Sequence, residues 1–77
     1  MITLKQLEAL LWIAELGTFE RAAAKLNTTQ SAISKRMHEL ETSTGIAIFN
    51  RHERKAQLTD EGDQLLVLAR QMLALMM

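Results

Sequence analysis

The chain has 77 residues, 48% of them apolar, and its formal net charge at pH 7 is zero. This length suits one small domain, and so much apolar content argues against intrinsic disorder. Because there is no cysteine, a disulfide framework and a thiolate metal site are both excluded. The lack of cysteine agrees with a cytoplasmic location, and the N-terminal residues have no signal-peptide pattern.

The charges are segregated along the chain. Residues 21–38 contain four Lys or Arg and no Asp or Glu, and residues 50–58 carry a net charge of +2. The intervening segments, residues 1–20, 39–49 and 59–77, carry −2 each. A phosphate backbone responds to the local potential within about 8–10 Å. Zero net charge therefore does not exclude a nucleic-acid partner, but it predicts weak non-specific binding.

The first predicted helix covers residues 4–16 and is ended by Gly17. Its core stripe is expected to consist of Leu4, Leu7, Leu11 and Ala14. Further apolar residues extend well past this stripe, so the helix should be buried on more than one side or meet a second helix. Trp12 is expected to serve in packing rather than in recognition, since aromatic residues of amphipathic helices are mostly buried.

Two short helices separated by a tight turn are predicted next. The first runs from Phe19 to about Leu26, with Thr18 as its N-cap. The polar residues 27–29 break the helical pattern, since their side chains compete for backbone hydrogen bonds. Thr29 then caps a second helix that reaches about Thr44, and Gly45 supplies a left-handed stop.

The second of these helices has two distinct faces. Ile33, Met37 and Leu40 form one apolar stripe. The side chains opposite this stripe and on the first turn are hydrogen-bonding or cationic: Gln30, Ser31, Ser34, Lys35 and His38. A solvated surface would look the same. The neighbouring helix and the acid-free window favour a recognition helix in a DNA major groove.

Residues 46–58 change to a pattern typical of a small hairpin. Ile46, Ile48 and Phe49 are β-branched or aromatic, residues 50–57 are a polar loop, and Leu58 follows. Arg51, Arg54 and Lys55 gather at or beside the tip. The hairpin is either a solvated loop or a wing whose arginine enters a minor groove or holds phosphate, and the neighbouring helix pair favours the wing.

The last predicted helix begins after Thr59, with two acidic residues in its first turn. From residue 65 to residue 77 only Arg70 and Gln71 are polar. Such a segment is too short for a bilayer span, which takes about 20 residues. It should instead meet another chain or an absent domain. The residues assigned to dimerisation are Trp12, Leu65, Leu68, Met72, Leu75 and Met76.

Four blocks of sequence, LKQLEALLWIAELGTFERAAAKLN, TQSAISKRMHELE, GIAIFNR and LTDEG, carry a family resemblance. With their spacing, they resemble the N-terminal winged helix-turn-helix domain of LysR-type transcriptional regulators over nearly the whole chain. The resemblance implies a mostly α fold: three helices, a two-stranded β-hairpin wing and a long C-terminal linker helix. It divides the chain into a DNA-binding domain, residues 1–58, and a dimerisation helix, residues 59–77. It also implies a homodimer, or a tetramer in a longer parent, and a small-molecule effector bound by a C-terminal domain absent here.

The same resemblance assigns roles to individual residues. Base reading falls on Gln30, Ser31, Ser34 and Lys35. Phosphate contacts fall on Lys5, Thr18, Thr29, Arg51 and Arg54. This sequence departs from the family pattern at three positions, with serine for proline at 31, lysine for arginine at 35 and threonine for leucine at 44. A lysine lacks the planar fork that reads guanine, so Lys35 contacts either a base or only phosphate. A dimer would read an imperfect palindrome in double-stranded DNA.

Three other functions compete with DNA binding. Ser34 and His38 share a helix at i, i+4, but no third group orients the imidazole, so no enzyme, metal or cofactor is expected. A membrane-surface helix is disfavoured because the tail carries one cation, Arg70. The strongest rival is a winged-helix module for protein–protein association without DNA binding, which salt-sensitive binding to duplex DNA would exclude.

Overall fold

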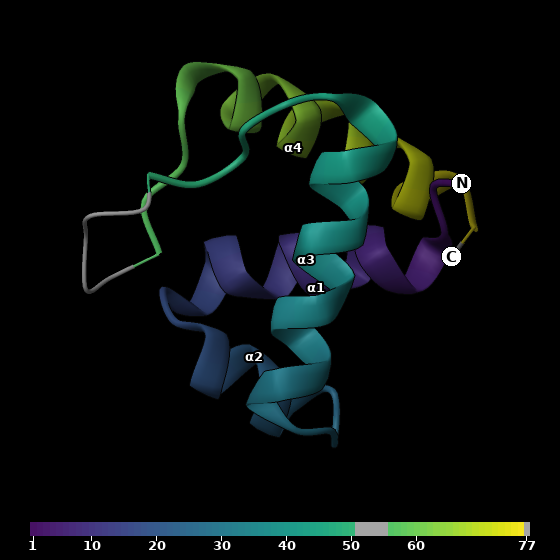
Figure 1. Ribbon diagram of the computed structural model, residues 1–77. Coiled ribbons are helices and arrows are strands. Elements are labelled where there is room, and N and C mark those ends of the chain that lie inside the picture. Colours follow the sequence, from purple (N-terminus) through teal and green to yellow (C-terminus); the bar gives the residue numbers. More distant parts are fainter. Residues whose placement is uncertain (51–55, 77) are drawn as a thin grey trace.

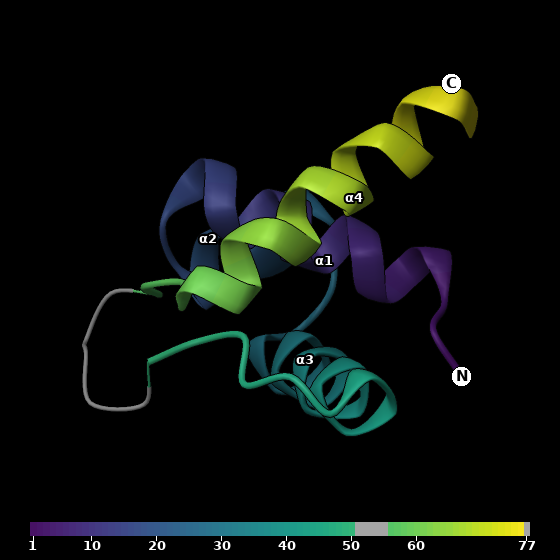
Figure 2. The same cartoon turned by 90° about the horizontal axis from the view of Figure 1, so that it is seen from above.

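The computed structural model describes residues 1–50 and 56–76, which form four helices in chain order (Figure 1). They are α1 (Leu4–Leu16), α2 (Phe19–Lys25), α3 (Gln30–Thr44) and α4 (Asp60–Met76). α1 packs against each of the other three helices, and α2 also packs against α3. Within these described ranges, no Cα atom of α3 lies within 8 Å of one in α4. Figure 2 shows α4 lying across α1, with α3 to one side.

The predicted mostly helical architecture is confirmed, with boundaries that follow from capping residues. Thr18 accepts the N–H of Arg21 at 3.0 Å, and Thr29 accepts the N–H of Ala32 at 3.1 Å, as N-caps do. Gly17 and Gly45 have φ values of 89° and 71°, the left-handed conformation that ends a helix. α1 starts with a reciprocal capping box between Thr3 and Gln6, a feature that was not predicted.

The turn between α2 and α3 is a Schellman motif. The N–H of Thr28 bonds to the carbonyl of Ala23 at 2.9 Å, and the N–H of Asn27 to that of Ala24 at 3.2 Å. Asn27 takes the left-handed conformation, with φ of 59°. Asparagine tolerates this region better than most residues other than glycine, so Asn27 allows α3 to follow α2 at once.

The core is centred on α1, and it corrects the predicted stripe of this helix. Leu4 is 41% exposed, and Leu11 and Ala14 are only partly buried. The buried face instead includes Gln6 and four apolar residues, Leu7, Ala9, Leu10 and Ile13. Because α1 contacts helices on several sides, its buried arc is wider than one amphipathic stripe. No helix in the described part of the chain is long and apolar enough to cross a membrane.

The segment after α3 has less β structure than predicted. In the described residues it forms one isolated antiparallel bridge, between Phe49 and Leu58, and no longer strand. The N–H of Asn50 bonds to the carbonyl of Gln57 at 2.8 Å beside this bridge. These pairs bring the two flanks of residues 51–55 together.

Residues 47 and 48 are joined to the start of α4. The Thr59 N–H bonds to the Ile48 carbonyl at 2.9 Å, and the Thr59 hydroxyl donates to the Ala47 carbonyl. The same hydroxyl oxygen accepts the N–H of Gly62 at 3.0 Å, as an N-cap does. A Cβ added at Gly62 would overlap the Ile48 carbonyl oxygen and lie 3.1 Å from Leu58 Cδ2. Gly62 is therefore required by a close approach of two backbones.

We predict that Gly62→Ala destabilises the protein by about 1–3 kcal/mol, because backbone must move to admit the methyl group. Helix propensity alone would favour alanine by about 1 kcal/mol. Thermal unfolding followed by circular dichroism measures the change, about 4–8 °C of Tm for each kcal/mol. A rise in Tm would show that the two backbones do not meet. Gly45→Ala measures a different cost, the strain of a left-handed residue, since its φ is 71° and nothing lies within 4 Å of its Cβ position.

Candidate nucleic-acid interface

The predicted faces of α3 are confirmed. Ile33, Met37 and Leu40 are at most 2% exposed and pack into the core. The side chains assigned to base reading, Gln30, Ser31, Ser34 and Lys35, are all exposed in the first two turns of α3. The α3 N-terminus and these side chains together form a polar surface of donors and acceptors. A groove of a nucleic acid presents the complementary groups.

Thr18 and Thr29 are N-caps that each carry a hydroxyl group. Each hydroxyl oxygen accepts a backbone N–H of the helix it starts. A hydroxyl also has one O–H donor, which capping leaves available. Thr29 is exposed and Thr18 is partly buried. Both positions are therefore compatible with donation to a phosphate oxygen. Lys5 is exposed in the first turn of α1.

The predicted wing contacts Arg51 and Arg54 lie outside the described residues. Their flanks, however, are attached to the start of the helix-turn-helix. The N–H of Ala56 bonds to the Gly17 carbonyl at 3.3 Å. The rings of Phe19 and Phe49 meet edge to face, with centroids 5.3 Å apart. Phe49 and Ala56 therefore both lie beside the α1–α2 turn and the start of α2.

Two cations make contacts that the sequence did not indicate. Lys25 Nζ lies 4.6 Å from the centroid of the Trp12 ring, a cation–π contact between α2 and α1. Arg70 of α4 forms a salt bridge with Glu15 of α1, and both side chains are somewhat under half exposed. The spacing along the sequence could not reveal either pair, because each joins two helices.

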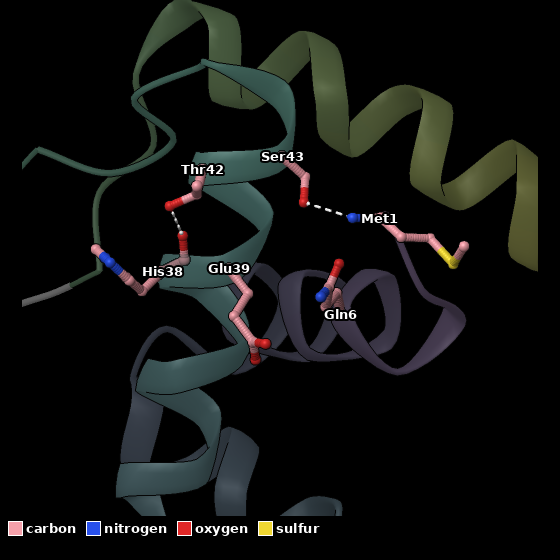
Figure 3. Close-up of a pocket in the computed structure, with 6 residues that line it drawn as sticks. All are labelled: Met1, Gln6, His38, Glu39, Thr42 and Ser43. Carbon is pink, nitrogen blue, oxygen red and sulfur yellow. Dashed lines mark hydrogen bonds between the residues drawn. The ribbon is translucent and has the colours of Figure 1, made fainter.

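A shallow pocket lies between the C-terminal half of α3 and the start of the chain (Figure 3). It is lined by Met1, Gln6, His38, Glu39, Thr42 and Ser43. The Met1 amino group donates to Ser43 Oγ at 3.1 Å, and the Thr42 hydroxyl donates to the His38 carbonyl at 2.9 Å. In Figure 3 the His38 side chain points away from Gln6.

The described residues contain no group of three or more His, Cys, Asp or Glu that could hold a metal ion.

α4 carries most of the exposed apolar surface. Leu68, Met72, Leu75 and Met76, all assigned to dimerisation, are 55%, 49%, 88% and 65% exposed. Leu65 was assigned with them, but it is 9% exposed and packs into the core of its own chain. Trp12 is partly buried beside Lys25. The exposed apolar surface of α4 therefore excludes Leu65.

Comparison with known proteins agrees with this geometry. The model of the bacterial regulatory helix-turn-helix proteins, lysR family, matches residues 4–63. The uncharacterized HTH-type transcriptional regulator YdcI of Escherichia coli K12 is 45% identical over 65 residues, 84% of this chain and 21% of that protein. The chain thus spans about a fifth to a quarter of the length of such relatives.

Two solved DNA complexes are also similar. Vibrio fischeri DarR in complex with DNA superimposes with a TM-score of 0.93 at 30% identity, over 99% of this chain and 26% of that one. The CbnR_DBD–DNA complex gives a TM-score of 0.90 at 33% identity, over 95% of this chain and 84% of that one. With the match over residues 4–63, these similarities show that the chain belongs to the lysR family of bacterial regulatory helix-turn-helix proteins.

Proposed function

We propose that this chain is the DNA-binding domain of a bacterial transcription regulator and binds double-stranded DNA in a sequence-specific way. α3 enters the major groove. The observation that carries this proposal is the exposed polar surface on the first two turns of α3, built on a helix-turn-helix scaffold. The likeness to two protein–DNA complexes supports it. The role is non-enzymatic, needs no cofactor and belongs to the cytoplasm.

Base reading is proposed for Gln30, Ser31, Ser34 and Lys35. A glutamine amide matches the N6 and N7 atoms of adenine with two hydrogen bonds. Serine is short, so Ser31 and Ser34 can come close to base edges or phosphates. Lys35 supplies a point charge that suits either a guanine edge or a phosphate.

Phosphate binding is proposed for Lys5, Thr18, Thr29, Arg51 and Arg54. The N-terminus of α3 adds free N–H groups and the positive end of the helix dipole. Residues 50–57 act as a β-hairpin wing on phosphate or the minor groove. The bonds from Ala56 to Gly17 and from Asn50 to Gln57 support this, since they fix both ends of the loop beside α2.

The chain is proposed to act as a homodimer. In this division, residues 1–58 bind DNA and residues 59–77 form the linker and dimerisation helix. Contacts between the two copies come from Trp12 and four exposed residues of α4, Leu68, Met72, Leu75 and Met76. Two α3 helices would then meet half-sites separated by about one helical turn or a multiple of it, an imperfect palindrome. In a longer parent protein, a C-terminal domain would bind a small-molecule effector and could assemble tetramers.

The alternative is a winged-helix module that associates with proteins and does not bind DNA. The exposed apolar residues of α4 would then be the functional surface. Neutralising phosphates releases counterions, so a DNA reader loses affinity steeply as salt rises, whereas an apolar interface does not.

We predict that selection from a random duplex pool at two salt concentrations enriches a two-fold-related motif. Gln30→Ala should blur one position in each half-site, since a bidentate base contact is worth about 1–3 kcal/mol of discrimination. Gln64→Ala removes an exposed amide from α4 and is the matched control. If no motif is enriched and no binding depends on salt, the association module is the better account.

Substitutions at Thr29 separate capping from phosphate binding. Thr29→Ala should lower the free energy of unfolding by about 1 kcal/mol, since a cap is lost. Thr29→Asp and Thr29→Asn should both keep the cap. Asp should nevertheless lower DNA affinity at least about tenfold through repulsion of phosphate, while Asn should not. Thermal unfolding and fluorescence anisotropy measure the two effects. Equal DNA affinity of the Asp and Asn variants would show that Thr29 does not contact phosphate.

A further pair of variants tests the dimer helix. Leu68→Gln should raise the dimer dissociation constant by about tenfold, the effect of losing some 1.4 kcal/mol of apolar contact. Val67→Gln is the matched control, because Val67 is equally exposed at 55% but lies a quarter-turn or more around α4. Analytical ultracentrifugation gives both constants. Equal effects of the two changes would contradict the assigned interface.

A further inference from the structure

The recognition helix and the dimerisation helix do not contact each other directly. In residues 1–50 and 56–76, α3 and α4 both pack on α1 and have no Cα atoms within 8 Å of one another. Yet the spacing of two α3 helices in a dimer depends on how α3 is oriented relative to α4. Their relative orientation is therefore fixed indirectly, through α1, through α2, which packs on both α1 and α3, and through the segment between α3 and α4.

Ile48 lies in that segment and is bonded to both helices. Its N–H donates to Glu41 Oε2 of α3 at 2.8 Å. Its carbonyl accepts the N–H of Thr59 at 2.9 Å and lies against Gly62 in the first turn of α4. The Ile48 side chain is fully buried. One residue thus connects the end of α3 to the start of α4 through both of its backbone polar groups.

The hydrogen bond from the Ile48 N–H to the Glu41 carboxylate is the part of this connection that depends on a single side chain. Hydrogen bonds from a backbone N–H to a carboxylate are shorter and stronger than neutral ones, and 2.8 Å is in their range. The N–H belongs to a buried residue, so losing its acceptor carries a desolvation penalty that favours a shift of the segment. The adjoining turn is braced by Thr44, whose hydroxyl donates to the Leu40 carbonyl and accepts the Ile46 N–H.

We infer that Glu41 is a positioning residue that, through Ile48, sets the orientation of the recognition helix relative to the dimerisation helix and thereby the half-site spacing that the dimer accepts. The spacing part of this inference rests on the proposed DNA-binding function. Glu41 itself need not contact DNA. Glu41 instead affects the relative position of the two α3 helices in the dimer and leaves their base-reading side chains unchanged.

The first test needs no DNA. The chain has no cysteine, so Glu39→Cys on α3 and Gln71→Cys on α4, both exposed positions, accept one spin label each. Pulsed electron paramagnetic resonance then measures the distribution of distances between the helices. Glu41→Ala should broaden or shift it, and Glu41→Gln, which keeps an acceptor oxygen, should restore the wild-type distribution. If Glu41→Ala does not fold, Glu41→Asp, with its shorter reach, takes its place. An unchanged distribution overturns the inference.

The second test uses duplexes whose two half-sites are moved apart one base pair at a time. Wild type and Glu41→Gln should show a sharp optimum of affinity. In Glu41→Ala the ratio of the highest to the lowest Kd across the spacing series should fall by about tenfold, while affinity for a single half-site changes little. Glu39→Ala, which removes a nearby exposed carboxylate, should keep the wild-type optimum. Absence of any optimum in wild type would refute the proposed dimeric reader. A wild-type optimum that Glu41→Ala retains would refute only the role of Glu41.

Discussion

The packing of three helices against α1 is the constraint on which the rest of this structure depends. A chain of 77 residues has little interior, and burial of α1 supplies much of it. Ile13 and Leu10 of α1 are fully buried together with Ile33 and Leu40 of α3. The apolar face of α3 is thereby committed to α1 and its polar face is left outward. The surface proposed to read DNA is thus a consequence of how the core closes.

Capping links this scaffold to its proposed chemistry. A helix N-terminus needs acceptors for its first N–H groups, and Thr29 supplies one for α3. The same N-terminus is where phosphate is favoured, because the remaining N–H groups and the dipole point outward. Thr29 can therefore stabilise the helix and still offer its hydroxyl proton to a ligand. One side chain can serve both tasks because the oxygen that accepts and the proton that is donated are different parts of one group.

The features that could be predicted from the sequence were mainly those set by residues close together in the chain. The helices, their caps at Thr18 and Thr29 and the apolar stripe of α3 follow from local periodicity and capping chemistry, and the structure has them. The stripe of α1 was wrong at Leu4, because the burial of that helix is decided by three partners rather than by its own pattern. The roles of the proposed DNA contacts come from family resemblance and not from local pattern.

Contacts between separate segments of the chain could not be predicted from the sequence. Glu41 and Ile48 are seven residues apart, and Gly62 meets Ile48 only after the chain has passed through residues 51–55. The LTDEG block was identified by resemblance, yet its physical reason is the close approach of two backbones at Gly62 together with the hydrogen bonds of Thr59. This α3–α4 junction, formed by Glu41, Ile48, Thr59 and Gly62, is visible only in the folded structure.

The α3–α4 junction and the proposed base-reading surface are under different physical constraints. Gln30, Ser31, Ser34 and Lys35 are exposed, and substitutions at exposed positions usually change stability little. Gly62 has no room for another side chain, and Glu41 accepts an N–H from a fully buried residue. On the proposed assignment of base-reading residues, sequence preference can vary on this scaffold without loss of the fold, whereas Gly62 and Glu41 restrict the geometry between α3 and α4. A regulator built in this way would change the bases it reads more easily than the spacing at which it reads them.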